Sequence, residues 1–388
     1  MTKIKSPELS VSISNGKADP GFTMDIFRIK EKKSIMSEAK PRLKYIDIAK
    51  ALSIFLLVLG HTLGYSEHCS GIYKAIYSFV VPLFFLVSGF VMKVKGTYRS
   101  FCFSRVMRIV IPYFIWAFLF LIPYAVLGNS TANSLDMEGQ SGITDLIKNV
   151  FYGIGKDGAL RQNSSLWFLP ALFSMEVAYY LLIRVIDKRN NWKIDVAALM
   201  GLCIFGYIVS RCLKIALPWG INTVLVAGPY FYAGYLLRKY CLIERIGKNK
   251  FCFAVLIAIG LLGLICGQKN SLLGFMSYTY ENMLLGYISG IGLSVVTLLL
   301  AYRIRDDAVL EKCGCNTMSI MIFHKLVVLM FQTQAGKITM LLKCSNLVVE
   351  LLLSVAITVM AIGFSLVVAS VLRRIAPFSI GEWRRKHI

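Results

Sequence analysis

Ten apolar stretches, each close to the length that crosses a lipid bilayer, constrain this chain more than any other feature of its sequence. A helix needs about 20 mostly apolar residues to span the hydrocarbon core. Lipid offers no hydrogen-bond partner to a bare backbone, so such segments form helices. The chain is 56% hydrophobic and 16% charged, more apolar than soluble domains. We therefore predict an all-α integral membrane protein with about ten transmembrane helices, at 46–65, 72–92, 106–127, 166–186, 194–210, 221–237, 251–266, 283–302, 317–334 and 347–372.

The placement of lysine and arginine predicts the orientation of these spans, because both residues accumulate in cytoplasmic loops. With the N-terminus inside, every inner loop is more basic than either neighbouring outer loop. This pattern predicts an even number of spans and two cytoplasmic termini. Basic loops that face an anionic inner leaflet also explain the net charge of +22. Membrane lipids are therefore expected partners, and nucleic acid is not.

Three regions follow one another along the chain. Residues 1–41 are polar and lack apolar periodicity, so we predict a disordered cytoplasmic extension, within which Met36 is a candidate translation start. Residues 42–375 are the predicted transmembrane domain, and residues 376–388 a basic cytoplasmic tail. Most of the ten cysteines lie in spans or inner loops, so we expect neither a disulfide framework nor a metal site.

One histidine, His61, falls inside the first predicted span, and an ionisable side chain in a bilayer marks a candidate functional site. The step from Lys50 to His61 makes about three helical turns and roughly 16 Å of rise, so the two side chains share one face. Asp47 precedes Lys50 by one turn and lies on the same stripe. The alternative interpretations are a helix-packing histidine, and a lysine that snorkels to the membrane surface with its counterion.

Five segments, taken in order, resemble the membrane-bound acyltransferase family 3, and within it the branch similar to fucose 4-O-acetylases. The resemblance covers residues 42–375 and rests on the order of the segments, since each alone is weakly specific. One position departs from the pattern: much of the family has arginine where this chain has Lys50, which keeps the charge but loses the bidentate fork. The segments are Tyr45–Lys50 with Gly60-His61, Pro82–Phe90, Arg105–Arg108 with Ile111–Tyr113, Leu166–Leu169, and Ser319–His324.

The resemblance implies an enzyme of the plasma membrane that moves an acyl group, usually acetyl, from cytoplasmic acyl-CoA to a hydroxyl of a cell-surface or lipid-linked carbohydrate. It assigns His61 as the general base. The spacing of Lys50 and Asp47 lets these two residues form an ion pair near the inner surface. Direct transfer and an acyl-histidine intermediate both stay open. Arg105 and Arg108 would hold the CoA phosphates, because guanidinium groups match phosphate geometry. Their alternative interpretation is plain positive-inside anchoring.

Later spans carry further candidates. Glu176 could orient the acceptor sugar or hold an arginine. Trp167 could stack on a sugar face, although tryptophan also forms the interfacial belt of membrane proteins. His324, with Lys325 beside it, resembles a late family histidine and could be a second base, an acceptor ligand or a packing residue. Gly89, after a serine in the second span, predicts a close approach between helices.

A transporter or polysaccharide exporter is the alternative function, since ten spans with interior prolines and buried charges also suit a broken-helix carrier. The halves of such carriers repeat, and the sequence contains no internal repeat. The enzyme interpretation makes a geometric prediction instead. A cavity should connect Arg105 and Arg108 to His61, with Lys50 along its wall.

Overall fold

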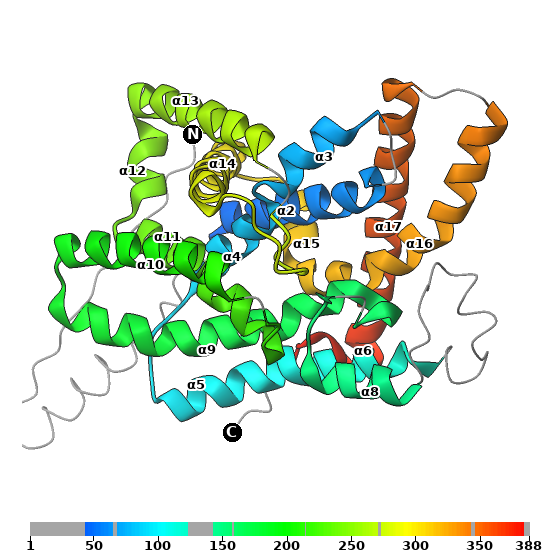
Figure 1. Cartoon of the computed structure of the whole chain (residues 1–388), viewed down its shortest axis with the longest axis horizontal. Coiled ribbons are helices and arrows are strands. Elements are labelled where there is room, and N and C mark those ends of the chain that lie inside the picture. Colours follow the sequence, from blue (N-terminus) through cyan, green and yellow to red (C-terminus); the bar gives the residue numbers. More distant parts are fainter. Residues whose placement is uncertain are drawn as a thin grey trace, which may run out of the picture. The chain divides into compact units, whose positions relative to one another are not determined.

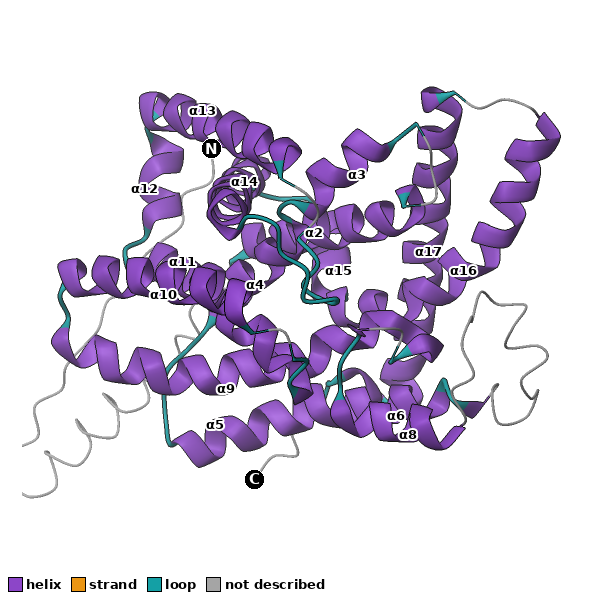
Figure 2. Ribbon diagram, viewed as in Figure 1, coloured by secondary structure: helices purple, strands orange, loops and turns teal. Residues whose placement is uncertain are grey.

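The computed structural model describes residues 43–64, 68–122, 143–156, 159–213, 215–270, 273–342 and 346–383. The predictions for residues 1–41, including the candidate start at Met36, fall outside the described residues. The described chain is built from helices and loops, as Figures 1 and 2 show, with one isolated β-bridge between Gly274 and Thr279.

The helices vary from short single turns to elements longer than a bilayer span. Their bounds are α2 Lys44–Leu63, α3 Ser70–Tyr77, α4 Val80–Val91, α5 Tyr98–Arg105, the π-helix η1 Val106–Val110, α6 Ile111–Leu119, α8 Ile143–Tyr152, the 3₁₀ helix η3 Arg161–Trp167, α9 Phe168–Ile186, η4 Asp187–Arg189, α10 Trp192–Cys212, η5 Pro218–Gly220, α11 Ile221–Lys239, α12 Leu242–Lys248, α13 Lys250–Lys269, α14 Met283–Ile304, α15 Ala308–Cys315, α16 Thr317–Leu342, α17 Leu347–Ile375 and η6 Pro377–Ile380.

The structure confirms the predicted all-helical membrane architecture. Within the described residues, seven helical segments are long and apolar enough to cross a bilayer, and two bent pairs raise that number to nine. One pair joins α12 to α13 with a bend of 114°, and the other joins α15 to α16 with a bend of 84°. The remaining predicted run, 221–237, forms α11, which is buried along most of its length. Because α11 faces protein rather than lipid, it tolerates polar residues that lower its hydropathy.

Side-chain caps fix where several helices begin. In five helices the N-cap residue is Thr, Asn or Asp, and its side-chain oxygen accepts a hydrogen bond from a backbone amide of the first turn. Such caps satisfy amide groups that have no partner inside the helix. The capping residues are Thr97 for α5, Asn191 for α10, Asn282 for α14, Asp307 for α15 and Asn346 for α17.

Two glycines let α4 and α11 cross at close range, as the sequence predicted for Gly89. A Cβ atom on Gly89 would overlap the backbone carbonyl of Phe231, and one on Gly234 would overlap the carbonyl of Leu86. Small residues at such crossings allow backbone contact between membrane helices. The crossing is therefore specified on both partners.

α2 lies among six other helices and so fixes the position of its own polar residues. It packs against α3, α4, α14, α15, α16 and α17. Ile48, Ala49 and Ile54 are fully buried, and Gly314 of α15 lies directly against the backbone carbonyl of Asp47. Figure 1 shows α2 between α14 and α17. A helix held on so many sides carries His61 on a rigid support.

The chain beyond α17 packs back onto η1 and α6. The indole nitrogen of Trp116 donates to the carbonyl of Ser379 at 2.7 Å, and that of Trp383 donates to the carbonyl of Met107 at 2.8 Å. Ser379 and Ile380 are buried. The predicted basic tail thus begins with a packed turn.

Candidate functional site

His61 lies in the last turn of α2, against aromatic rings from two other helices. Its Nδ1 atom is 3.0 Å from the hydroxyl oxygen of Tyr77, at the end of α3. Its ring stacks on that of His324 in α16, with centroids 5.3 Å apart and planes inclined by 26°. The fold therefore brings the two candidate histidines of the first and ninth predicted spans into contact.

His324 is completely buried, and its hydrogen bonds identify its tautomer. Its Nδ1 atom is 2.8 Å from the carbonyl oxygen of Ile320, and its Nε2 atom is 3.4 Å from the hydroxyl oxygen of Ser165. A carbonyl can only accept, so Nδ1 carries the proton and Nε2 accepts from Ser165 in the neutral ring. His324 is thus engaged on both nitrogens, which favours a positioning role.

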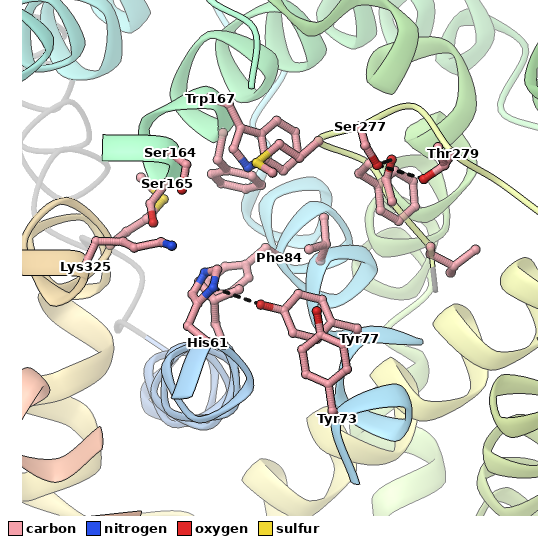
Figure 3. Close-up of a pocket in the computed structure, with 18 residues that line it drawn as sticks. His61, Tyr73, Tyr77, Phe84, Ser164, Ser165, Trp167, Ser277, Thr279 and Lys325 are labelled. Atoms are coloured by element: carbon pink, nitrogen blue, oxygen red, sulfur yellow. Dashed lines mark hydrogen bonds between the residues drawn. The ribbon is translucent and has the colours of Figure 1, made fainter. Parts of the chain in front are cut away.

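A cavity of about 330 Å³ opens beside His61 (Figure 3). Its wall is mainly apolar and rich in aromatic rings, with several hydroxyl groups and two basic side chains. No acidic residue is found among the described residues that line it. They are Leu57, His61, Tyr73, Tyr77, Val81, Phe84, Ser164, Ser165, Trp167, Phe168, Leu273, Gly274, Phe275, Met276, Ser277, Thr279, Met321 and Lys325.

One side of this cavity is formed by η3, which leads into α9. The Nδ2 atom of Asn163 donates to the carbonyl of Ile322 at 2.7 Å, and its Oδ1 atom accepts from the amide of Ser165 at 3.1 Å. This buried asparagine ties the serine pair to α16. Trp167 follows in the same turn, is only 8% exposed and lines the cavity. Its position inside the protein differs from that of an interfacial belt residue.

The loop between α13 and α14 forms another side. Figure 2 shows this segment turning inward between the helices. The hydroxyl of Thr223 donates to the carbonyl of Phe275 at 3.0 Å, and the Ser277 and Thr279 hydroxyls lie 2.7 Å apart. Burial raises the pKa of Tyr278 to about 12, as expected for a phenol withdrawn from water. A loop held this way supplies fixed hydroxyl groups to the cavity.

Lys325 reaches the same cavity from α16, one residue after His324. In Figure 3 its side chain extends toward the space above His61. The residue is half-buried, and the part of the chain that the structure describes contains no carboxylate in ion-pair contact with it. It also lies within electrostatic range of the His61 imidazole.

Lys50 and Asp47 meet near the start of α2. Their Nζ and Oδ1 atoms are 3.3 Å apart, with Asp47 buried and Lys50 half-buried. This is the ion pair that the spacing predicted. Neither residue lines the His61 cavity.

Arg105 and Glu176 form a second ion pair, between α5 and α9. The Arg105 Nε and Glu176 Oε2 atoms are 2.7 Å apart, and both side chains are largely buried. Arg105 also lies over the Phe101 ring, 4.8 Å from its centroid, and Arg108 is exposed in η1. Of the two predicted roles for Glu176, the structure supports the one in which it holds an arginine. A π-helix at this point is notable because such turns occur often at functional sites.

The predicted passage between the arginines and His61 is not part of the cavity described above. Arg105, Arg108, Glu176 and Lys50 do not line it. The connection therefore stays a prediction. Among the described residues, no group of three or more histidine, cysteine or acidic side chains is arranged to hold a metal ion.

Comparison with known proteins identifies the family to which the chain belongs. A family model described as an acyltransferase domain matches residues 43–372 of the chain. The chain belongs to this family. It is also similar to nodulation protein NolL of Mesorhizobium japonicum, with 24% identity over 253 residues. That alignment covers 62% of this chain and 58% of the relative, so the chain matches little more than half of NolL. Membership of the acyltransferase family confirms the resemblance found in the sequence.

Within this acyltransferase domain, several cavity residues escaped the sequence analysis. Tyr77 lies one turn after Tyr73 in the second predicted span, a spacing that puts both on one face and could have identified them. Ser165 lies two residues before Trp167, and its place beside that predicted segment is the signal that could have identified it. The loop residues Ser277 and Thr279 carry no local signal, because only the folded chain brings them to His61.

Proposed function

We propose that this acyltransferase moves an acetyl group from cytoplasmic acetyl-CoA to a hydroxyl of a cell-surface or lipid-linked carbohydrate at the plasma membrane. Family membership and the similarity to NolL support a membrane O-acyltransferase in general. The finer proposal is carried by one observation: His61 borders a cavity of about 330 Å³ with aromatic and hydroxyl-bearing walls. Concave sites of this kind, mostly apolar with a few polar groups, suit small ligands.

His61 acts as the general base. A sugar hydroxyl is a weak nucleophile, so its proton must leave as its oxygen attacks the thioester carbonyl carbon. His61 accepts that proton at Nε2 if its Nδ1–H donates to the oxygen of Tyr77, 3.0 Å away. The tetrahedral intermediate then collapses, the C–S bond breaks, and the imidazolium returns the proton to the CoA thiolate. The products are an acetyl ester and free CoA.

Arg105 and Arg108 bind the phosphates of the donor. Arg108 is exposed and Arg105 is held by Glu176, so the end of α5 and the start of η1 offer one exposed and one oriented guanidinium group. Guanidinium groups bind phosphate oxygens in pairs. The acyl arm then extends past the Lys50–Asp47 pair toward His61, which lies roughly 16 Å further along α2. Glu176 acts on the donor side, through Arg105.

The acceptor lies on the aromatic wall. Trp167 is buried at the cavity and is the ring best suited to stack on a sugar face. Ser164, Ser277 and Thr279 supply hydroxyl groups that can bond to sugar hydroxyls. The cavity thus has the mixture of aromatic surface and neutral polar groups that a carbohydrate requires.

The test uses the full-length protein purified in detergent and given acetyl-CoA labelled in the acetyl group. The wild type should release CoA and label a glycan, and mass analysis of glycan from a strain lacking the gene should identify the missing acetyl ester. His61→Ala should lower the rate by about 100-fold or more while the protein inserts and purifies normally. The matched control is His68→Ala, since His68 is exposed and paired with Glu350 at 3.1 Å.

The outcomes separate the alternatives. A transporter or exporter would release no CoA in either protein. Full acetylation by His61→Ala would overturn the base role, and an unchanged glycan in the deletion strain would overturn the carbohydrate acceptor.

A further inference from the structure

Lys325 is a basic residue that has no role in the acetyl transfer proposed above. It and His61 are the basic side chains among the described residues that line the cavity. His324, its neighbour in sequence, stacks on His61, so α16 brings the ammonium to the same end of the cavity as the base. Figure 3 shows Lys325 and Ser165 on one side of His61, with Ser277 and Thr279 on the far side.

A positive charge in this position is costly unless something balances it. Charged side chains inside membrane domains are expensive and usually pair with an opposite charge. The described residues that line the cavity include no acid, and none of the described carboxylates forms an ion pair with Lys325. Among the described residues no side chain supplies the balancing negative charge, and a ligand or the charge that develops in the reaction can supply it.

Two of the other polar groups at this end, those of His324 and Ser165, are already engaged. The Nδ1–H of His324 donates to the carbonyl of Ile320, and the Ser165 hydroxyl donates to Nε2 of His324. Neither can donate to a new acceptor without losing its present bond. Lys325, the residue after His324 in the chain, is a cationic donor on the same cavity wall.

We propose that Lys325 is a catalytic residue that stabilises the oxyanion formed on the thioester carbonyl. The inference rests on the proposed acetyl transfer. As the acceptor oxygen bonds to the thioester carbonyl carbon, His61 takes the proton of the acceptor hydroxyl. The π electrons of the carbonyl group move to the carbonyl oxygen. The ammonium stays protonated and donates a hydrogen bond to this O⁻, and it releases the oxygen when the carbonyl reforms and the C–S bond breaks. Donors fixed in advance at the developing charge are among the largest contributions to catalysis.

Steady-state kinetics of Lys325→Met and Lys325→Arg in the full-length protein test this role. Methionine keeps most of the volume and removes the charge, so kcat should fall about 100-fold or more, with the KM values for acetyl-CoA and glycan each within about threefold of wild type. Lys325→Arg should recover at least about tenfold over methionine, because it restores a cation. The control is Lys148→Met, which removes an exposed lysine of α8 and should leave both constants unchanged.

Two results would overturn the proposal. A raised KM for the glycan with unchanged kcat would mean that Lys325 recognises a ground-state anion on the acceptor, which comparison of phosphorylated, uronate-containing and neutral glycans would then identify. Unchanged kinetics in Lys325→Met would mean that it has no role. If His61→Ala is inactive while Lys325→Met is fully active, the proposed function stands and the oxyanion role fails. Should the methionine variant not fold, Lys325→Gln carries the same two outcomes.

Discussion

The His61 cavity and the Arg105–Glu176 pair differ in whether a buried charge lies next to an opposite charge. At the pair, a carboxylate and a guanidinium lie 2.7 Å apart, with both side chains largely buried. In the cavity, two basic side chains face a space whose described lining contains no acid. The first region is neutral at rest, whereas the second holds a positive charge without a partner among the described residues.

The difference indicates two roles for buried charge: the Arg105–Glu176 pair holds two helices together, and the cations of the cavity can stabilise negative charge that develops in a reaction. A buried ion pair offsets its desolvation cost only through its partner, so each member depends on the other. An unpaired cation gains its compensation only when negative charge develops nearby. We therefore expect substitutions at the pair to change stability first, and substitutions in the cavity to change rate.

The largest effect on stability is expected for Glu176→Ala. Removing this carboxylate leaves the Arg105 guanidinium buried without its partner, which typically costs about 3–5 kcal/mol. Thermal unfolding in detergent should show a clearly lower melting temperature. The control is Asp145→Ala, which breaks an exposed pair with Lys148 and should cost at most about 1 kcal/mol.

A double variant sharpens this result. In Arg105→Met/Glu176→Met both charges are replaced by apolar groups, which is often close to neutral. Its melting temperature should therefore lie near that of the wild type, well above that of Glu176→Ala. Equal destabilisation in the single and double variants would show that packing, not charge pairing, explains the effect.

Arg105→Ala/Arg108→Ala tests the donor side, where a smaller effect is expected. Each charge-assisted contact to a phosphate contributes about 1.5–3 kcal/mol, so the KM for acetyl-CoA should rise by at least about tenfold. Because these groups lie away from the reacting atoms, kcat of the folded protein should change little. The variant also leaves Glu176 buried without its partner, so its melting temperature should fall as well. Arg99→Ala, on an exposed position of α5, is the matched control. An unchanged KM would leave the two arginines as topology signals only.

Much of the fold was predictable because lipid imposes a simple rule on apolar segments. All ten predicted runs contain helices, and Gly89 lies at a close crossing as its small size suggested. The bends between α12 and α13 and between α15 and α16 were not predicted, since no proline marks them. α11 also differs from the predicted lipid-facing span. It is buried against protein rather than lipid, and it can therefore carry Asn222 in its first turn.

The candidate site was predictable in part, for a related reason. Residues on one helix keep their spacing, so Lys50 and Asp47 meet as expected. Contacts between distant helices depend on how the helices pack, which spacing alone does not give. The stacking of His61 on His324 and the contact of Arg105 with Glu176 arise in this way. The position of Lys325 in the cavity has the same origin.

Tyr77→Phe should give the smallest effect on kcat. It tests how a neutral group of the cavity, the Tyr77 hydroxyl, orients the base His61. The substitution removes only the hydroxyl that lies 3.0 Å from Nδ1 of His61. A neutral hydrogen bond contributes about 0.5–1.5 kcal/mol, so kcat should fall by about 3–10-fold with both KM values unchanged. Tyr207→Phe, on α10 and away from the cavity lining, should leave kcat at the wild-type value. A loss as large as that of His61→Ala would instead mean that Tyr77 takes part in proton transfer, and the cavity would then rely on a coupled pair rather than on one oriented imidazole.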